Sequence, residues 1–468
     1  MVQDEVSLRA KRSNLFKLIA LSLCCATLLA MTRYDERSIM NILLMTNTYK
    51  PLVGGLEKSV TCFAKEFRAA GHRVIIVAPE FPDMLTEEDV IRVPAMQHFH
   101  GTDFSIELPF KETFMDALGD FTPHIVHSQH PFLIGDTALR VASKYNVPLV
   151  FTHHCLYEEN VHYMPGNEEA LKRFMIELST GYANLADQVF APSESVMLML
   201  KERGVTTPIE VIPTGIYTAE FEQGDGKTLL QHLNIPEGSM VIGHVGRLAP
   251  EKNLEFVTRA VAQFLKGNPK VHFLVGGTGP SEEAIKGIMI QEGVIDRLHL
   301  VGMLKGQDLV NAYQAMNVFV FSSHSETQGL VVTEAMAAGI PVVALDAPGV
   351  REVVKDTVNG RLLKDESVED FMAALNWFKE LPESEINTIK KACHMTAHQF
   401  EMKVCAEKAL KIYFSITTNH GFSLRYREDR FWPNAVRSIQ AQWGLTKNLT
   451  QATGAFMTQS PPIALDKV

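Results

Sequence analysis

Hydrophobic residues follow two different spacings along the chain from Met40 onward. Short runs of β-branched and other apolar residues predict buried strands, while longer stretches with an apolar residue every three or four positions predict amphipathic helices. Within residues 56–70, for example, Leu56, Val60 and Phe67 fall on one helical face. The regular alternation of the two patterns is typical of βαβ units on a parallel sheet.

The predicted strands form two series. The first consists of Asn41–Asn47, Arg73–Ala78, Ile125–Ser128, Leu149–His153, Gln188–Ala191 and Glu210–Pro213. The second consists of Val241–Val245, Val271–Gly276, Leu298–Gly302, Val318–Ser322 and Pro341–Leu345. A stretch with several glycines and prolines, residues 219–239, is interpreted as the linker between them. The sequence therefore predicts an α/β protein with two doubly wound parallel-sheet domains, residues 40–220 and 221–400, a late helix within residues 401–420 and a C-terminal tail, residues 421–468.

Residues 1–39 require a separate interpretation. Basic residues precede an apolar run from Leu18 to Met31, as in the charged and hydrophobic regions of a signal peptide. The run is shorter than the roughly 20 residues that a spanning helix needs, and its positive flank would direct everything after it to export. Two interpretations stay open: a signal or anchor, or an extension upstream of a start at Met40, which the strand beginning at Asn41 favours.

Composition excludes several classes of protein. The 468 residues have ordinary globular proportions, with 46% hydrophobic and 21% charged residues, so the chain is neither disordered nor collagen-like. Lysine and arginine number 44 against 54 acidic residues, so the net charge of −10 argues against nucleic acid as a partner. The six cysteines form no CxxC pair and are interpreted as reduced thiols; Cys155, beside two histidines, is interpreted as a bystander.

Residues with candidate chemistry in the first domain follow predicted strands, where ligands bind in open α/β sheets. Gly54 and Gly55 stand between the first strand and a helix, where backbone N–H groups can approach an anion. His127 and His130 follow one strand, and His153 and His154 follow the next. Histidine is a common metal ligand, but no carboxylate lies beside this group at ligand spacing, so the sequence predicts no metal site.

In the second domain, too, the residues with candidate chemistry follow predicted strands. Arg247 and Lys252 follow its first strand, where both could bind a diphosphate. Gly277 belongs to a glycine-rich turn after the next strand that lacks the Gly-Lys-Ser/Thr of a Walker loop.

Two glutamates eight positions apart complete the pattern in this domain. Gly329 is expected to open a helix that ends near Ala338, and its first N–H groups, at Leu330 and Val331, form an anion site. Glu326 precedes this helix, while Glu334 lies within it, where a carboxylate can accept hydrogen bonds from ribose hydroxyls.

From Met40 to Ile412, the order of these motifs resembles the retaining glycosyltransferases of family 4, which have the GT-B fold of two facing Rossmann-like domains with a cleft between them. The resemblance implies a nucleotide-sugar donor, retention at the anomeric carbon and no required cofactor. It implies that His154, Glu326, Arg247 and Lys252 are catalytic. It further implies that the donor site comprises Gly54, Gly55, Arg247, Lys252, Gly277, Gly329, Leu330 and Glu334, and that the acceptor side includes His127, His130 and Tyr157.

The run from Thr152 to Tyr163 is similar to a stretch of bacterial diacylglycerol glucosyltransferases, although Cys155 and Asn160 depart from the commonest pattern. It indicates transfer of glucose from UDP-glucose to a lipid such as diacylglycerol. One alternative is another nucleotide sugar with a phosphoinositide, polyprenyl or soluble glycan acceptor. A nucleotide-sugar epimerase or a non-enzymatic sugar-binding protein is a second, from a different class.

Location follows from the expected substrates. Nucleotide sugars are cytosolic, so we expect a cytoplasmic protein associated peripherally with the inner face of the cell membrane. A basic surface on the first-domain helix could contact an anionic bilayer; it consists of Lys58, Lys65, Arg68 and Arg73. By analogy with GT-B proteins, residues 401–420 are expected to return to the first domain.

Overall fold

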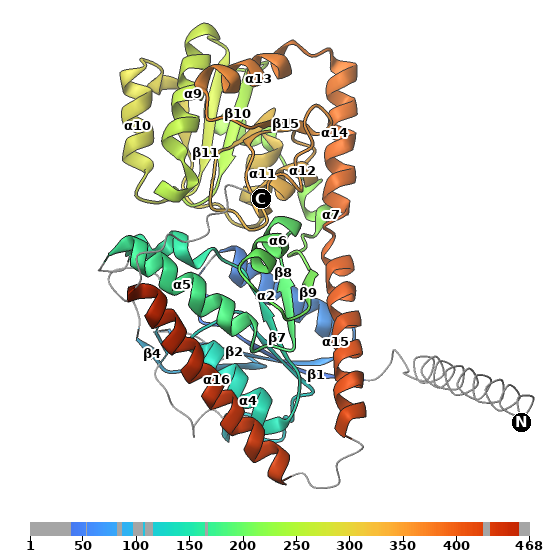
Figure 1. Ribbon diagram of the computed structural model, residues 1–468. Helices are drawn as coiled ribbons and strands as arrows, with labels where there is room; N and C mark the ends of the chain where they lie inside the picture. The colour runs from blue at the N-terminus through green and yellow to red at the C-terminus, as the bar shows by residue number, and fades with distance from the viewer. Residues whose placement is uncertain are drawn as a thin grey trace, which may run out of the picture.

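The computed structural model describes residues 39–457, apart from residues 53, 82–86, 97–105, 108–115, 164–166 and 425–430. These residues form two α/β domains, one above the other in Figure 1. The signal-like segment up to residue 38 lies outside the described residues. Among the helices that the structure describes, none combines the length and apolar character needed to cross a bilayer.

The first domain contains a seven-stranded parallel sheet in the order β3-β2-β1-β6-β7-β8-β9. Its strands are β1 (Asn41–Met45), β2 (Arg73–Pro79), β3 (Val90–Val93), β6 (Ile125–Ser128), β7 (Leu149–Thr152), β8 (Gln188–Ala191) and β9 (Ile209–Val211). Leu43 on β1 pairs with Ile75 on β2 and with Val126 on β6. Its helices are α2 (Gly55–Ala69), α4 (Ile134–Tyr145), α5 (Glu168–Ala183) and α6 (Glu194–Glu202), with a 3₁₀ segment η2 (Tyr157–Tyr163) and an antiparallel pair, β4 (Ala95–Met96) and β5 (Ile106–Glu107).

The second domain contains a six-stranded parallel sheet in the order β12-β11-β10-β13-β14-β15. Its strands are β10 (Met240–Val245), β11 (Val271–Gly276), β12 (Leu298–Leu300), β13 (Val318–Phe321), β14 (Val342–Leu345) and β15 (Gly360–Leu363). Its helices are α9 (Leu254–Gly267), α10 (Glu282–Gln291), α11 (Gly306–Gln314), α12 (Leu330–Ala337), α13 (Val368–Glu380) and α14 (Glu383–His398), with the 3₁₀ turns η3 (Pro250–Lys252) and η4 (Ile295–Arg297).

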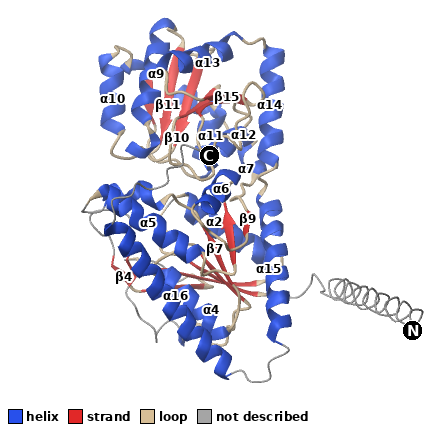
Figure 2. Ribbon diagram, viewed as in Figure 1, coloured by secondary structure: helices blue, strands red, loops and turns tan. Residues whose placement is uncertain are grey.

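The predicted fold class is confirmed, and each sheet has the strand order of a doubly wound fold. Figure 2 shows helices flanking the strands of both sheets. The strands are apolar along their length because both faces of each sheet are covered: Ile42 belongs to one core cluster of the first domain and Leu43 to the other. In each sheet the strand order reverses beside the first strand, between β1 and β6 and between β10 and β13. Ligands of such folds bind at the carboxyl ends of the strands beside this reversal.

The segment interpreted as a linker is partly helical, which corrects the sequence interpretation. It contains most of α7 (Thr218–Phe221) and all of α8 (Gly226–His232). Leu229, Leu230 and Leu233 pack against the core of the second domain, so glycines and prolines mark the ends of short helices here rather than a free linker. The edge strands β3 and β15 were also absent from the predicted series.

The end of the chain packs on the first domain. Helix α15 (Met402–Leu424) contributes Met402, Leu410 and Tyr413 to the core beneath β1 and β2. The predicted tail contains a further helix that the sequence analysis did not identify, α16 (Phe431–Met457), which lies along α4 and α5 in Figure 1. Ala441 and Leu445 of α16 join the other core cluster of the first domain.

The chain crosses between the domains at two places that touch each other. The backbone N–H of Ile216 donates to the carbonyl of Phe400, and that of Met402 donates to the carbonyl of Ile216, both at 2.8 Å. A Cβ atom on Gly215 would lie 2.3 Å from the Cα of Met402, so only glycine permits this approach. The two crossings therefore form one compact connection.

Candidate active site

The sequence-predicted chemistry collects where the two domains meet. In the second domain, the loops after β10 and β13 carry Arg247, Lys252 and Glu326 on the two sides of the strand-order reversal. In the first domain, the loop after β7 faces the same region, since the Thr327 hydroxyl donates to the carbonyl of His154 at 2.8 Å. This hydrogen bond joins the loops of the two sheets directly.

Lys252 and Glu326 form an ion pair across the reversal. The Lys252 ammonium lies 2.5 Å from Oε1 of Glu326, and both side chains are largely buried. The Ser322 hydroxyl donates to the carbonyl of Asn253 at 2.9 Å, which ties the two loops together beneath the pair. Asn253 adopts the left-handed conformation, with φ of 50°, and so ends η3 and begins α9. Both charges are held in place by backbone geometry.

Arg247 is the more accessible cation. Its guanidinium contacts Glu251, four residues further along the loop, yet 53% of its side chain is exposed. The other oxygen of Glu251 is buried and has no hydrogen-bond partner among the residues that the structure describes. Arg247 can therefore turn toward an anion while Glu251 remains beside it.

Gly277 supports the Arg247 loop from behind. Its φ of 132° excludes most other residues, and a Cβ atom there would lie 1.8 Å from the carbonyl oxygen of Gly246. Gly279 approaches Leu248 in the same way, and the Leu248 N–H donates to the Thr278 carbonyl at 3.0 Å. The glycine-rich turn thus shapes the neighbouring loop, a role that its sequence alone did not indicate.

Helix α12 begins and ends as its sequence predicts. Gly329 caps it with φ of 68°, and its first turn leaves the N–H groups of Leu330 and Val331 without intrahelical acceptors. Glu334, with only 5% of its side chain exposed, accepts a hydrogen bond from the Tyr313 hydroxyl at 2.9 Å through Oε2. Its Oε1 contacts the ammonium of Lys58, which comes from α2 of the first domain. The two domains are therefore joined by a mostly buried ion pair.

Gly54 and Gly55 form the start of α2 and are exposed. Gly54 is the N-cap, with extended backbone and no side-chain cap. A Cβ atom on Gly55 would meet nothing within 4 Å in the described part of the chain. A Cβ atom on Gly54 would instead lie 2.5 Å from a carboxylate oxygen of Glu57, so within the first turn of α2 only Gly55 has open space beside it.

His154 is held by a residue that the sequence analysis did not single out. Its Nε2 lies 2.7 Å from Oε1 of Gln129, in the loop after β6. Burial lowers the pKa of His154 to about 3, so the ring is neutral at physiological pH. Because an amide oxygen only accepts, Nε2 carries the proton and Nδ1 presents a lone pair. Gln129 is the second residue after His127, directly after a strand, which is the signal that could have identified it.

The three side chains expected on the acceptor side, those of His127, His130 and Tyr157, are buried in the structure. His127 bonds to Thr152 at 2.6 Å through Nε2 and to Tyr413 at 2.5 Å through Nδ1, so both of its ring nitrogens are occupied. His130 accepts from the backbone N–H of Asn47 at 3.1 Å. Tyr157 is buried, and its ring packs edge-on against His153. These residues fix loops and helices, and none of them presents an exposed side chain.

Cys155, the residue after His154, lies within reach of charges from both domains. Burial raises the pKa of its thiol to about 12, and the charges of Glu57, Lys252 and Glu326 act on it as well. The thiol therefore stays protonated and is a poor nucleophile. Within the described parts of the chain, no group of three or more His, Cys, Asp or Glu residues could hold a metal ion.

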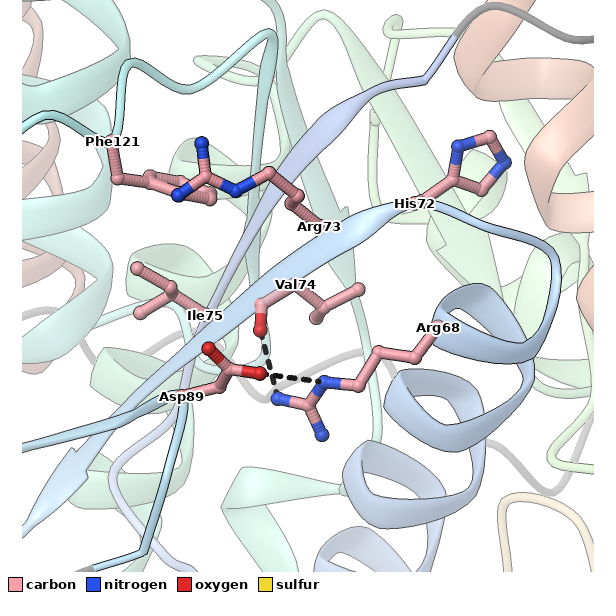
Figure 3. Close-up of a pocket in the computed structure, with 7 residues that line it drawn as sticks. All are labelled: Arg68, His72, Arg73, Val74, Ile75, Asp89 and Phe121. Carbon is pink, nitrogen blue, oxygen red and sulfur yellow. Dashed lines mark hydrogen bonds and ion pairs between the residues drawn. The ribbon is translucent and has the colours of Figure 1, made fainter.

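The four basic residues expected to form one surface lie on α2 and at the start of β2, and they do not come together. Lys58 reaches Glu334, and Lys65 lies 4.1 Å above the ring of Tyr217. Arg68 and Arg73 instead line a pocket of about 260 Å³ at the amino end of β2 (Figure 3). There Arg68 donates to the Val74 carbonyl at 2.8 Å and pairs with Asp89 at 3.6 Å. This pocket lies at the opposite end of the strand from the domain interface.

Comparison with known proteins gives two family matches. Residues 226–395 match the family described as "Glycosyl transferases group 1", and residues 53–220 match "Glycosyltransferase Family 4". The chain is 31% identical, over 69% of its length and 75% of the relative's, to alpha-monoglucosyldiacylglycerol synthase of Streptococcus pneumoniae. It is 28% identical, over 69% of its length and 84% of the relative's, to GDP-mannose-dependent alpha-mannosyltransferase of Mycobacterium tuberculosis. Its fold is similar to that of a sucrose-phosphate synthase from Thermosynechococcus elongatus, with a TM-score of 0.66, 23% identity and coverage of 80% of this chain and 98% of that one.

Proposed function

The chain belongs to the family 4 glycosyltransferases, and we propose that it transfers glucose from UDP-glucose to diacylglycerol or a closely related lipid, with retention at the anomeric carbon. The observation that carries this choice is the similarity to the pneumococcal synthase, whose name states a glucosylated diacylglycerol as its product. That the chain is a hexosyltransferase acting on a nucleotide sugar follows from the family itself.

In this proposal the second domain holds the donor. Arg247 and Lys252 bind the diphosphate, and the first N–H groups of α12, at Leu330 and Val331, add the positive end of the helix dipole. Glu334 accepts hydrogen bonds from the ribose hydroxyls. The buried position of Glu334 supports this role, because a carboxylate away from water binds hydroxyls more selectively than an exposed one.

Transfer then depends on stabilising the leaving group. As the bond between the anomeric carbon and the phosphate oxygen breaks, negative charge develops on the nucleoside diphosphate, where Arg247 and Lys252 are already placed. The acceptor hydroxyl attacks from the same face, and its proton passes to the departing phosphate oxygen. Glu326 and the neutral His154 position the sugar. Nδ1 of His154, a lone-pair acceptor, would receive a hydrogen bond from a sugar hydroxyl.

A second candidate donor is GDP-mannose, since a relative of similar identity is named for it. A phosphoinositide, polyprenyl or soluble glycan acceptor would fit the same donor geometry. A sugar-binding protein is disfavoured, because it has no use for two phosphate-directed cations together with the Glu326 and Glu334 pair. A nucleotide-sugar epimerase is disfavoured by the match to glycosyltransferase families.

We place the reaction at the inner face of the cell membrane, where cytosolic donor and lipid acceptor meet. Of the four cations Lys58, Lys65, Arg68 and Arg73, only Arg68 on α2 and Arg73 on β2 are grouped at one pocket, and acidic partners lie close to both. The contact with the bilayer therefore does not depend on α2 as a single basic surface.

The test is a lipid-labelling assay with the full chain. Radiolabelled UDP-glucose or GDP-mannose is incubated with liposomes containing diacylglycerol, and label in the organic phase is counted. Label from UDP-glucose that falls to background in Glu334→Ala, and persists in the exposed control Glu255→Ala, supports the proposal. Lipid label from GDP-mannose alone overturns the donor assignment. Slow release of free sugar without lipid label overturns the acceptor assignment.

A further inference from the structure

Lys58 occupies a position that its sequence did not indicate. It lies in the first turn of α2, after Gly54 and Gly55, and crosses to the second domain, where its ammonium contacts Oε1 of Glu334. The ring of Phe221 lies 5.5 Å from the same ammonium. Burial opposes the charge of this lysine, but Glu334 outweighs burial, so the pKa of Lys58 is raised and the side chain stays protonated.

Glu334 is thereby held from both domains. Tyr313, on α11 of its own domain, donates to Oε2 at 2.9 Å, while Lys58 of the opposite domain contacts Oε1. An ionised carboxylate offers about four acceptor positions. Two of them therefore remain for further donors after Lys58 and Tyr313 have taken theirs.

The first turn of α2 is tied to the same region by a second route. The Ser59 hydroxyl, adjacent to Lys58, is bonded to the Thr214 hydroxyl at 2.9 Å. The backbone N–H of Thr214 donates to Gln328 Oε1 at 2.7 Å, and the Thr214 carbonyl accepts from Gln328 Nε2 at 2.5 Å. Gln328 immediately precedes Gly329, the N-cap of α12. The hydrogen bonds from Ser59 through Thr214 to Gln328 therefore fix the start of α2, and Lys58 with it, relative to the start of α12.

We propose that Lys58 is a positioning residue for the nucleotide: from the first domain it orients the carboxylate of Glu334, so that the ribose hydroxyls are held tightly only while the two domains are in contact. This inference rests on the role proposed above for Glu334. The affinity for the nucleotide then depends on contact between the two domains. The reason is that Lys58, which orients the ribose-binding carboxylate of Glu334, belongs to the domain that does not hold the nucleotide.

Two alternative roles for Lys58 lead to different binding results. If Lys58 simply occupied the place of the ribose hydroxyls, the nucleotide would have to displace it, and removing the ammonium would tighten binding. If Lys58 instead acted on the diphosphate, its removal would weaken every diphosphate equally, with or without ribose hydroxyls.

The test measures binding of UDP and of 2′,3′-dideoxy-UDP by calorimetry to the wild type, Lys58→Met, Lys58→Arg and the control Lys65→Met. Lys65 is a lysine of the same helix that lies over Tyr217 instead of Glu334. We expect Lys58→Met to weaken UDP by about tenfold, as for loss of one charge-assisted hydrogen bond. Binding of the dideoxy nucleotide should change by less than about twofold in the same variant, and Lys58→Arg should recover most of the affinity for UDP.

Three outcomes would overturn the inference: unchanged or tighter UDP binding in Lys58→Met, an equal loss for both nucleotides, or a loss of the same size in Lys65→Met. A thermal unfolding midpoint within a few degrees of the wild type establishes that Lys58→Met is folded. Failure of the proposed function has its own signature, which is no binding of UDP, GDP or ADP by the wild type; it would remove the inference as well. If GDP binds in place of UDP, the same comparison is made with 2′,3′-dideoxy-GDP.

Discussion

Lys252 and Glu326 face each other across the point where the strand order of the second sheet reverses, with 2.5 Å between the ammonium and the carboxylate. Seventy-four residues separate them in the chain, but β10 and β13 are neighbours, so the loops that follow these strands bring the two charges together. The lysine is therefore positioned before any ligand arrives.

Replacing Lys252 should weaken binding of the donor and remove the partner of Glu326. Lys252→Ala removes a cation and leaves the mostly buried Glu326 without its partner, so we expect at least a tenfold rise in KM for the nucleotide sugar. Steady-state kinetics with varied donor would measure this. Lys266→Ala, which removes an ion pair on the outer end of α9, provides the control. An unchanged KM in Lys252→Ala would contradict the assignment.

Gln129 should matter for turnover more than for donor binding. Gln129→Met keeps the length of the side chain but removes the acceptor for Nε2 of His154, which leaves the ring free to rotate. We expect kcat to fall by about tenfold to a hundredfold, since misplacement of a group near the reacting atoms has effects of that order.

The matched control is Gln188→Met, at the start of β8. Gln188 is also buried and donates to the carbonyls of Val189 and Pro208, so its loss should lower the thermal midpoint without lowering kcat. Equal kcat values for Gln129→Met and wild type would show that His154 needs no orienting partner.

As the pH is lowered, the protein should begin to lose stability at a pH well above the pKa values of carboxylates. Burial lowers the pKa of His127, His130, His153 and His154 to about 3, and that of His244 to about 4. The unfolded chain takes up protons at these histidines below about pH 6.5, whereas the folded chain does not, so stability falls as the pH falls. Each fully shifted histidine contributes up to about 1.4 kcal/mol per pH unit below 6.5.

The measurement is the thermal unfolding midpoint between pH 7.5 and 5. We expect it to be nearly constant down to about pH 6.5 and to decline steeply below it. A midpoint that stays constant down to pH 5 would mean that these histidines are not buried in the neutral form.

The bond between Tyr413 and His127 should stabilise the first domain without taking part in the reaction. Tyr413→Phe keeps the stacking of the ring on Phe190 but leaves a buried ring nitrogen of His127 unpaired, which costs about 1–3 kcal/mol. Chemical denaturation would measure the loss. Activity well below the unfolding midpoint should match the wild type, and a large drop in kcat there would contradict a purely structural role.

The sequence was sufficient to predict helices and strands that bury large apolar residues at regular spacing. Both central sheets follow from runs such as Ile42–Met45, and α12 follows from Gly329 and the apolar helix after it. Helix α16 was missed because most of the residues that it is described as burying are small or polar: Ala441, Asn448 and Ala452, with Leu445 as the one large apolar residue among them. Such residues give almost no hydrophobic periodicity, although they allow the close approach of α16 to α5, where Asn448 packs against Gly181.

Roles that depend on distant partners could not be predicted. Tyr413 lies 286 residues from His127, and Glu334 lies 276 residues from Lys58. On the sequence alone His127 looks like a member of a histidine cluster, and Lys58 looks like a member of a basic helix surface. Only the packing of α15 and the contact of the two domains assigns them elsewhere.

The helices at the end of the chain have a consequence for synthesis on the ribosome. Tyr413 of α15 and Leu445 of α16 complete the two core clusters that cover the sheet of the first domain, yet they are translated after the entire second domain. The second domain draws its core from one uninterrupted stretch, from Ile216 to Ala397, and can close as soon as that stretch has left the exit tunnel. The domain that is made first is thus the one that finishes folding last.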